Sequence, residues 1–494
     1  MSVSYPLLYQ LNTRVYLTEL SHRLGRPATL DDLPDELFHG LRETGFHWIW
    51  LLSVWQTTPA AREVSRSDPG WRTEFQHTLP DLSDQDIDGS GFAIADYVVA
   101  EHLGGDQALA QLRDRIRRHG LKLMLDFVPN HMGLGHRWVE EHPDFFISGS
   151  LTDRDREPHN YTVVETAHGE RVLAFGRDPY FAGWPDTLQL DYSNPRLQEA
   201  LIEILRKIGK QCDGLRCDMA MLVLPEIFER TWGRRPTDFW SAATQRVRED
   251  QPGFCFMAEV YWDLEWAMHQ HGFDYAYDKC LYDRLRAGNA IQVRDHLRAE
   301  LSYQQKLARF LENHDEPRAA SVFPPDMHAA AAAITFLTPG LRFFHQGQRE
   351  GFHKRISPHL IRGPEESVDG KIAEIYDRIL AILRTPLLGH GGWQLLECRA
   401  AWDGNPTHEA MIAFQWNAPG ERSLLVVVNY APHQSQCYVT LPAEHLAGQD
   451  WLLIDRLGQA TYERAGDQLA HDGLFIDAGP WQASAFEFTP AESQ

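Results

Sequence analysis

The sequence has no apolar run long enough to span a bilayer. A transmembrane helix needs about 20 consecutive apolar residues, and the longest candidate, around 329–337, is short and rich in alanine. We therefore expect a buried helix there and no membrane partner. The first twenty residues also lack a basic segment followed by an apolar stretch and a small-residue cleavage site. On these grounds we expect a cytoplasmic protein.

Cysteine and basic residues are both scarce. The 494 residues include six scattered cysteines without CxxC spacing, which predicts neither a disulfide framework nor a zinc site. Basic residues number 47 against 69 acidic ones, a formal charge of -22. Such a surface repels nucleic-acid phosphates and anionic lipid. We expect a neutral substrate and no nucleic-acid partner, and the sequence leaves the oligomeric state open.

Short apolar, β-prone runs alternate with amphipathic helices over most of the chain. This alternation indicates a parallel sheet with helical crossovers, and eight such runs predict an α/β fold built on a (β/α)8 TIM barrel. The predicted strands are Tyr9–Val15, His47–Trp55, Leu121–Val128, Gly214–Met219, Phe254–Tyr261, Phe273–Tyr277, Ala308–Glu312 and Leu341–His345.

Two helices are marked by their ends as well as by their apolar stripes. In the first, Asn194 suits an N-cap, Pro195 the first helical position and Gly209 the C-terminus. In the second, over 106–119, apolar residues recur at helical spacing and Gly120 follows the last turn.

Two regions depart from the alternating pattern. Residues 132–190 are rich in His, Asp, Gly, Pro and aromatic residues, and the stretch is too long for a plain loop. We interpret it as a small domain inserted after strand three, with the barrel formed by 1–131 and 191–390. From 391 to 494, short strand-like runs separated by turn residues predict an antiparallel β-sandwich.

Four segments supply acidic residues at the ends of predicted strands, where barrel enzymes place their active sites. They contribute Asp126, Asp218, Glu259 and Asp315, with His131, Arg216 and His314 beside them. One acidic residue at a strand end is usually a capping or surface residue. Four such segments in order, each ending a strand of the same barrel, favour catalysis instead.

The sequence neighbours suggest different roles for two of these carboxyls. Arg216 and Asp218 are two apart on a strand and therefore face the same side; a cation beside Asp218 should lower its pKa. Glu259 has apolar neighbours, which should raise its pKa. An ionised and a protonated carboxyl about 5–5.5 Å apart are what retaining glycoside cleavage requires. Asp315 would add a third carboxylate.

These segments, LDFVPNH, GLRCDMAM, FMAEVYW and FLENHDEPR, resemble the four characteristic regions of the α-amylase family, glycoside hydrolase family 13. LQLDYSNP (188–195) and GLRFFHQGQREG (340–351) resemble further family segments. The resemblance spans nearly the whole chain, including the inserted domain and the C-terminal sandwich.

The resemblance implies a role for each site residue. Asp218 would be the nucleophile, Glu259 the acid/base and Asp315 a ligand of the sugar hydroxyls. Arg216 would hold Asp218, and Asp126 would brace Arg216. The sugar contacts that the resemblance implies are His131, His314 and an aromatic ring at Phe92. Trp262, which follows the acid/base closely in the chain, is a further predicted platform for the sugar.

The chain also departs from the family pattern. Phe92 stands where many relatives have a tyrosine, and Met221 and Leu222 replace a Lys-His pair that follows the nucleophile in many amylases. Asn130 matches a residue that ligates structural calcium in many relatives, so a calcium ion is left open; no cofactor is otherwise expected.

We therefore hypothesise a retaining hydrolase of α-1,4-linked glucose oligosaccharides or glucans. The first alternative is an α-glucosyl transferase or a disaccharide-processing enzyme acting on sucrose, trehalose or maltose. The second is a non-catalytic carbohydrate-binding protein with the amylase fold, which the presence of all three carboxylates disfavours.

Overall fold

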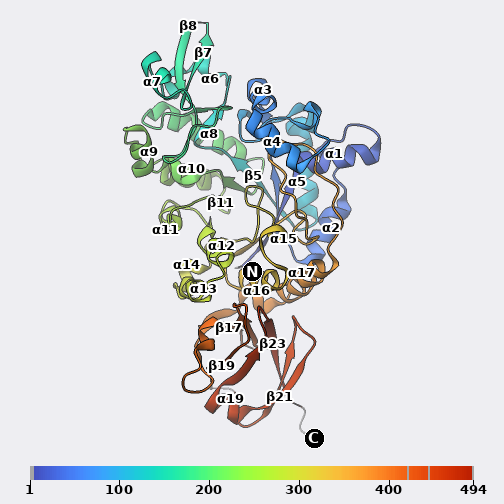
Figure 1. The fold of residues 1–494 in the computed structure, drawn as a ribbon. Helices are drawn as coiled ribbons and strands as arrows, with labels where there is room; N and C mark the ends of the chain where they lie inside the picture. The colour runs from blue at the N-terminus through green and yellow to red at the C-terminus, as the bar shows by residue number, and fades with distance from the viewer. Residues whose placement is uncertain (1–4, 168, 420–421, 443–445, 492–494) are drawn as a thin grey trace. The chain divides into compact units, whose positions relative to one another are not determined.

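The computed structural model describes residues 5–167, 169–419, 422–442 and 446–491 (Figure 1). By its internal contacts the chain divides into two compact units. One unit comprises residues 9–277 and 354–365. The other comprises the chain up to residue 8, 278–353 and the part from 366 on. Among the described helices, none has the length and apolarity to cross a membrane.

Eight strands form a closed barrel, as the sequence predicts, in the order β1-β14-β13-β12-β11-β10-β5-β2. Adjacent barrel strands such as β10 with β5 and β10 with β11 run parallel. The barrel strands are β1 (Leu7–Asn12), β2 (Trp48–Leu52), β5 (Lys122–Phe127), β10 (Gly214–Cys217), β11 (Cys255–Ala258), β12 (Tyr275–Tyr277), β13 (Leu307–Arg309) and β14 (Leu341–His345).

All of the predicted strands except Leu341–His345 are shorter in the structure, and for the first two a local reason is evident. β1 ends at Asn12 because its side chain accepts a hydrogen bond from Val15 N and caps α1 (Thr13–Leu24). The predicted strand His47–Trp55 is interrupted by Ser53, whose φ is 64°, and β3 (Trp55–Thr57) begins beyond it. The interruption brings the Ser53 N–H to the candidate site described below.

The marked helices form as predicted. Asn194 caps α8 (Pro195–Gly209), and Gly120, with φ of 74°, follows α5 (Gly105–Arg118). The alanine-rich run lies in the largely buried α16 (Pro325–Leu337). Other helices of the alternating region are α2 (Asp35–Thr44), α9 (Pro225–Trp232), α10 (Phe239–Asp250), α11 (Glu265–Gln270), α12 (Lys279–Arg286), α13 (Ala290–Leu297) and α17 (Gly370–Leu383).

The irregular stretch after β5 contains two small antiparallel pairs. β6 (His131–Gly133) pairs with β9 (Thr187–Gln189), and β7 (Tyr161–Thr166) pairs with β8 (Gly169–Ala174). The β6–β9 pair joins the start of the stretch to its end. That 132–190 is a separate domain stays a prediction.

The C-terminal part is antiparallel β structure around its own apolar core. One sheet has the order β15-β17-β18-β23-β20-β21 and the other β16-β19-β22, drawn in orange and red in Figure 1. The strands are β15 (Gly392–Leu396), β16 (Cys398–Ala400), β17 (Met411–Asn417), β18 (Leu424–Asn429), β19 (Ser435–Val439), β20 (Asp450–Asp455), β21 (Thr461–Ala465), β22 (Leu474–Ala478) and β23 (Ala483–Pro490).

Candidate active site

A single arginine joins the two carboxylates that follow β10 and β11. Arg216 Nη1 donates to Asp218 Oδ1 at 2.6 Å, and Arg216 Nη2 donates to Glu259 Oε2 at 2.7 Å. All three side chains are buried. Burial works against the charged guanidinium, but the carboxylates of Glu259 and Asp218 and the Tyr277 hydroxyl hold the pKa of Arg216 well above its usual value. The arginine is therefore a fixed positive charge shared by both acids.

Glu259 has polar neighbours rather than the apolar ones that its sequence context predicts. Its Oε2 also accepts from Met219 N at 2.7 Å, and its Oε1 accepts from the Tyr261 hydroxyl at 2.7 Å. With Arg216, three donors surround one carboxylate. These contacts fix the position of the carboxyl, as a group that transfers protons requires. The apolar sequence neighbours do not describe the surroundings of the carboxyl itself.

Asp126 is buried on the strand next to that of Arg216, and each of its carboxylate oxygens accepts a hydrogen bond from the protein. Its Oδ1 accepts from Trp50 Nε1 at 3.1 Å and its Oδ2 from Ser53 N at 3.0 Å, with only 1% of the residue exposed. The parallel register places Asp126 opposite Arg216 on the adjacent strand. This position suits a brace for the arginine, whereas the burial disfavours a direct sugar contact.

Three residues with strained backbone belong to this cluster or follow Glu259 closely in the chain. Ser53, Met219 and Trp262 have φ of 64°, 41° and 64°, in the left-handed region that non-glycine residues rarely occupy. Ser53 N and Met219 N donate to the Asp126 and Glu259 carboxylates. Strain of this kind typically persists where the surrounding structure enforces it at functional sites. No glycine or asparagine marks these positions, so sequence reasoning missed them.

Aromatic rings enclose the guanidinium of Arg216. Its Cζ lies 5.2 Å from the centroid of Phe92, 5.5 Å from Trp50 and 5.8 Å from Tyr277. Such contacts stabilise a desolvated cation. Phe92 thus contacts the arginine, a role for which a tyrosine hydroxyl is not needed; that its ring stacks on the sugar stays a prediction. Sequence reasoning did not identify Trp50 and Tyr277, which carry no motif of their own.

Further predicted sugar contacts lie in the same unit. His131 is buried, burial lowers its pKa to about 3, and its ring lies 5.2 Å from that of Trp184. The neutral imidazole is therefore available as a hydrogen-bonding group. Trp262 is 37% exposed and packs edge-on against Tyr180 at 5.1 Å, so the two rings form an exposed aromatic pair.

The residues that replace the Lys-His pair are apolar and inaccessible. Met221 and Leu222 lie in a 3-10 turn, Ala220–Val223, whose residues are all buried. They therefore contribute packing and offer no polar group to a leaving sugar.

The segment after β13 belongs to the other compact unit, and hydrogen bonds within the segment fix its conformation. Asn313 Oδ1 accepts from Asp315 N at 2.9 Å and from Glu316 N at 2.8 Å, which fixes the turn. His314 Nε2 lies 3.0 Å from Asp315 Oδ2. The histidine is buried and the Asp315 side chain is 39% exposed. That Asp315 and His314 meet the same sugar as Asp218 stays a prediction.

The residues around Asn130 do not fit the calcium ion that the resemblance suggests. Gln189 Nε2 lies 3.0 Å from Asn130 Oδ1, 2.9 Å from Asn130 O and 3.1 Å from Leu190 O. Gln189 Oε1 accepts from Arg177 N, which agrees with this orientation of the amide. Asp191, the nearby carboxylate, is paired with Arg234. The Gln189 amide N–H groups therefore already donate to the Asn130 and Leu190 oxygens, which a calcium ion would need as ligands.

This arrangement predicts that the stability of the folded protein does not depend on a bound metal ion but does depend on Gln189. Wild-type protein should melt at the same temperature with and without EDTA. Gln189→Leu should lower the free energy of unfolding by about 2–4 kcal/mol, because it leaves buried acceptors without a donor. The exposed Gln85→Leu serves as the control. A melting temperature that falls on chelation would contradict the assignment.

Comparisons with known proteins identify the family of the chain. Residues 38–371 match the family described as "Alpha amylase, catalytic domain". Trehalose synthase/amylase from Mycolicibacterium smegmatis is 27% identical over 206 residues, which is 37% of this chain and 33% of that protein. Maltase 1 from Drosophila virilis is 23% identical over 317 residues, 53% of this chain and 50% of that protein. The chain thus spans a third to a half of these curated relatives.

Solved structures share the fold at low identity. A noncanonic maltogenic α-amylase from Thermotoga neapolitana superposes with a TM-score of 0.70 and 18% identity over 99% of both chains. An α-amylase from Geobacillus thermoleovorans, complexed with acarbose, gives a TM-score of 0.66 and 18% identity over the full length of both. Because the catalytic-domain match covers more than half of the chain, this protein belongs to the α-amylase family.

Proposed function

We propose that the protein cleaves α-glucosidic bonds with retention, through a covalent glycosyl-enzyme on Asp218. The observation that carries the proposal is the single guanidinium that contacts both Asp218 and Glu259. It keeps the two carboxyl groups close together, which favours the short separation, about 5–5.5 Å, that a retaining mechanism uses. An inverting enzyme needs room for a water molecule between the sugar and its base.

In the first step, Asp218 attacks the anomeric carbon while Glu259 donates a proton to the departing glycosidic oxygen. The C–O bond to the leaving sugar breaks and an ester to Asp218 forms. In the second step, Glu259 takes a proton from water, and the resulting hydroxide oxygen attacks the same carbon and releases Asp218. Two inversions give net retention.

Arg216 supports both steps from one position. Its charge keeps Asp218 ionised as a nucleophile, and it stabilises the Glu259 carboxylate once the proton has left. Tyr261 positions the same carboxyl through its hydroxyl. In the proposed site, Asp315 and His314 bind the sugar hydroxyls, with His131 beside the reacting sugar and Trp262 under the next one.

The proposed substrate is a short α-1,4-linked glucose oligosaccharide. Several relatives whose sequences match are named for small glucosides: maltase, α-glucosidase and oligo-1,6-glucosidase. The test is to incubate the protein with maltoheptaose and follow the anomeric protons by NMR. The first product signal should be the α-anomer, and the β-anomer should appear only by mutarotation. Initial release of the β-anomer would refute retention.

Glucosyl transfer is the second candidate, favoured by the buried apolar pair Met221 and Leu222. Without polar groups at these positions, binding on the leaving-group side depends less on a long glucan. A trehalose synthase is also among the matching relatives. Incubation with maltose distinguishes the two candidates: hydrolysis gives glucose alone, whereas transfer gives trehalose or an oligosaccharide longer than maltose.

A further inference from the structure

Two of the six cysteines lie on neighbouring strands of the smaller C-terminal sheet. In the antiparallel pairing of β16 with β19, Cys398 is opposite Val439. Ala400, two residues further on, is opposite Cys437. Because side chains two apart on a strand point to the same face, Cys398 and Cys437 are diagonal neighbours on one face of the sheet. Both pack against the apolar core of the C-terminal sheets.

The thiols of these two cysteines are in contact. The Cys437 thiol donates a hydrogen bond to the Cys398 sulfur, and this bond, together with burial, raises the pKa of Cys437 above its ordinary range. Both residues are reduced in the structure. The thiol of Cys437 is therefore aimed at its neighbour's sulfur, and the pair has the proximity that a disulfide needs, although the two residues are far apart in sequence.

The two thiols differ in their access to solvent. Cys437 is fully buried, whereas Cys398 is half-buried. Cys398 also lines a surface pocket of about 630 Å³. The pocket is formed by residues of α13, β15, β16 and the 3-10 turn Pro406–Ala410. A small oxidant can therefore reach Cys398 through this pocket, whereas Cys437 is reached only through its partner.

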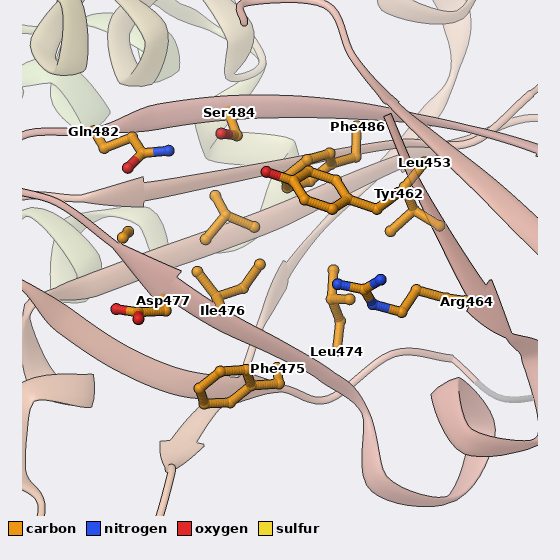
Figure 2. A pocket seen from close by; sticks show the side chains of 12 residues that line it. Leu453, Tyr462, Arg464, Leu474, Phe475, Ile476, Asp477, Gln482, Ser484 and Phe486 are labelled. Atoms are coloured by element: carbon orange, nitrogen blue, oxygen red, sulfur yellow. The ribbon is translucent and has the colours of Figure 1, made fainter. Parts of the chain in front are cut away.

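The two strands have room to bring the sulfurs together. β16 has three residues and lies at the edge of its sheet. On the other side of β19, Ile476 is opposite Cys437 and lines an apolar gap of about 210 Å³ between the two sheets (Figure 2). An S–S bond is about 2 Å long, shorter than a hydrogen-bonded contact between two sulfurs. Forming it requires a small shift, which an edge strand near an unfilled space can make.

We propose that Cys398 and Cys437 form a reversible disulfide when the protein meets a peroxide. The Cys398 thiolate attacks one peroxide oxygen, the O–O bond breaks, and a sulfenic acid forms while the departing hydroxide takes up a proton and becomes water. The Cys437 thiolate then attacks the Cys398 sulfur, the S–S bond forms, the S–O bond breaks and a second water leaves. Two thiols are oxidised and one hydrogen peroxide is reduced. A dithiol reductant reverses the reaction.

The alternative is that both cysteines serve only as small apolar residues of the core, as buried free cysteines often do. The position of Cys398 in an open pocket and the direction of the Cys437 hydrogen bond favour the disulfide instead. The bond would tie the edge strand β16 covalently to β19. It involves no residue of the candidate active site, so its test is independent of the proposed function.

The test is to treat the reduced protein with a small excess of hydrogen peroxide, alkylate the remaining thiols in denaturant and digest without reductant. Mass spectrometry should find the Cys398 and Cys437 peptides joined in most molecules, and dithiothreitol should release them. Cys437→Ser should leave the Cys398 sulfenic acid unresolved, so that its capture by dimedone rises about tenfold. Cys280→Ser is the matched control, because Cys280 is also partly exposed but lies in α12, outside these sheets; the cross-link should be unchanged in it.

Oxidation of Cys398 to the sulfonic acid without a cross-link would overturn the proposal. So would a disulfide that joins Cys398 to any other cysteine, of the same chain or of a second copy. Cys398→Ser should abolish the cross-link, and thermal unfolding checks that each variant is folded. Because Cys398 is only half-buried, this variant keeps the test valid if Cys437→Ser, at a fully buried position, is unstable.

Discussion

Asp218→Ala should lower the turnover of maltose by at least ~10⁴-fold, equivalent to about 5 kcal/mol of transition-state stabilisation. The variant lacks the nucleophile. Of the two carboxylates that Arg216 contacts, it loses Asp218 and keeps Glu259. Added azide should restore turnover of α-glucosyl fluoride, since the anion fits the space left by the side chain. The azide nitrogen attacks the anomeric carbon, fluoride leaves, and the product should be β-glucosyl azide.

The anomer of the product makes this prediction specific. An α-glucosyl azide would mean that azide enters from the opposite face, and Asp218 could not then be the nucleophile. Asp155→Ala, at an exposed aspartate of the inserted stretch, is the control for the loss of a carboxylate and should keep full activity. Thermal unfolding of each variant separates a loss of chemistry from a loss of fold.

Glu259→Ala should affect substrates according to their leaving groups. With maltose, whose glycosidic oxygen needs a proton, we expect a loss of about 10²–10⁴-fold. With α-glucosyl fluoride, formation of the glycosyl-enzyme needs no proton from Glu259, so this step should be nearly intact. The second step still lacks its base, and the intermediate on Asp218 should accumulate and be detectable by mass spectrometry of the intact protein.

Azide provides the complementary check for Glu259. It needs no deprotonation, so it should intercept the glycosyl-enzyme and yield α-glucosyl azide, the opposite anomer to that expected from the Asp218 variant. Equal losses with maltose and with the fluoride would contradict a proton-transfer role. Tyr261→Phe tests the positioning hydroxyl: it should lower the turnover of maltose more than that of the fluoride.

Sequence reasoning worked best where the determinants are local. Asn194 and Gly120 mark helix ends through their own side chain or backbone, and eight apolar runs predict the eight barrel strands. The acidic motifs also follow from sequence, because a strand that ends in a barrel places the next residues at its mouth. Each of these signals lies within a few residues of the feature that it predicts.

Local reasoning does not reach features in which a residue's surroundings come from another segment. Glu259 has apolar neighbours along the chain, yet its carboxyl meets Arg216 from the adjacent strand. Asn130 has the identity of a calcium ligand, but the amide of Gln189, 59 residues away in sequence, occupies its oxygen. Ser53 breaks a predicted strand and donates to Asp126.

By itself, then, the sequence determined the order and type of the elements and the identity of the acidic residues, because hydrophobic periodicity, caps and short motifs are properties of neighbouring residues. Only the tertiary structure decided that one arginine serves both Asp218 and Glu259, that an amide stands at the supposed cation site, and that the thiols of Cys398 and Cys437 meet across neighbouring strands. These features depend on side chains that are distant along the chain and become neighbours only through strand register and packing.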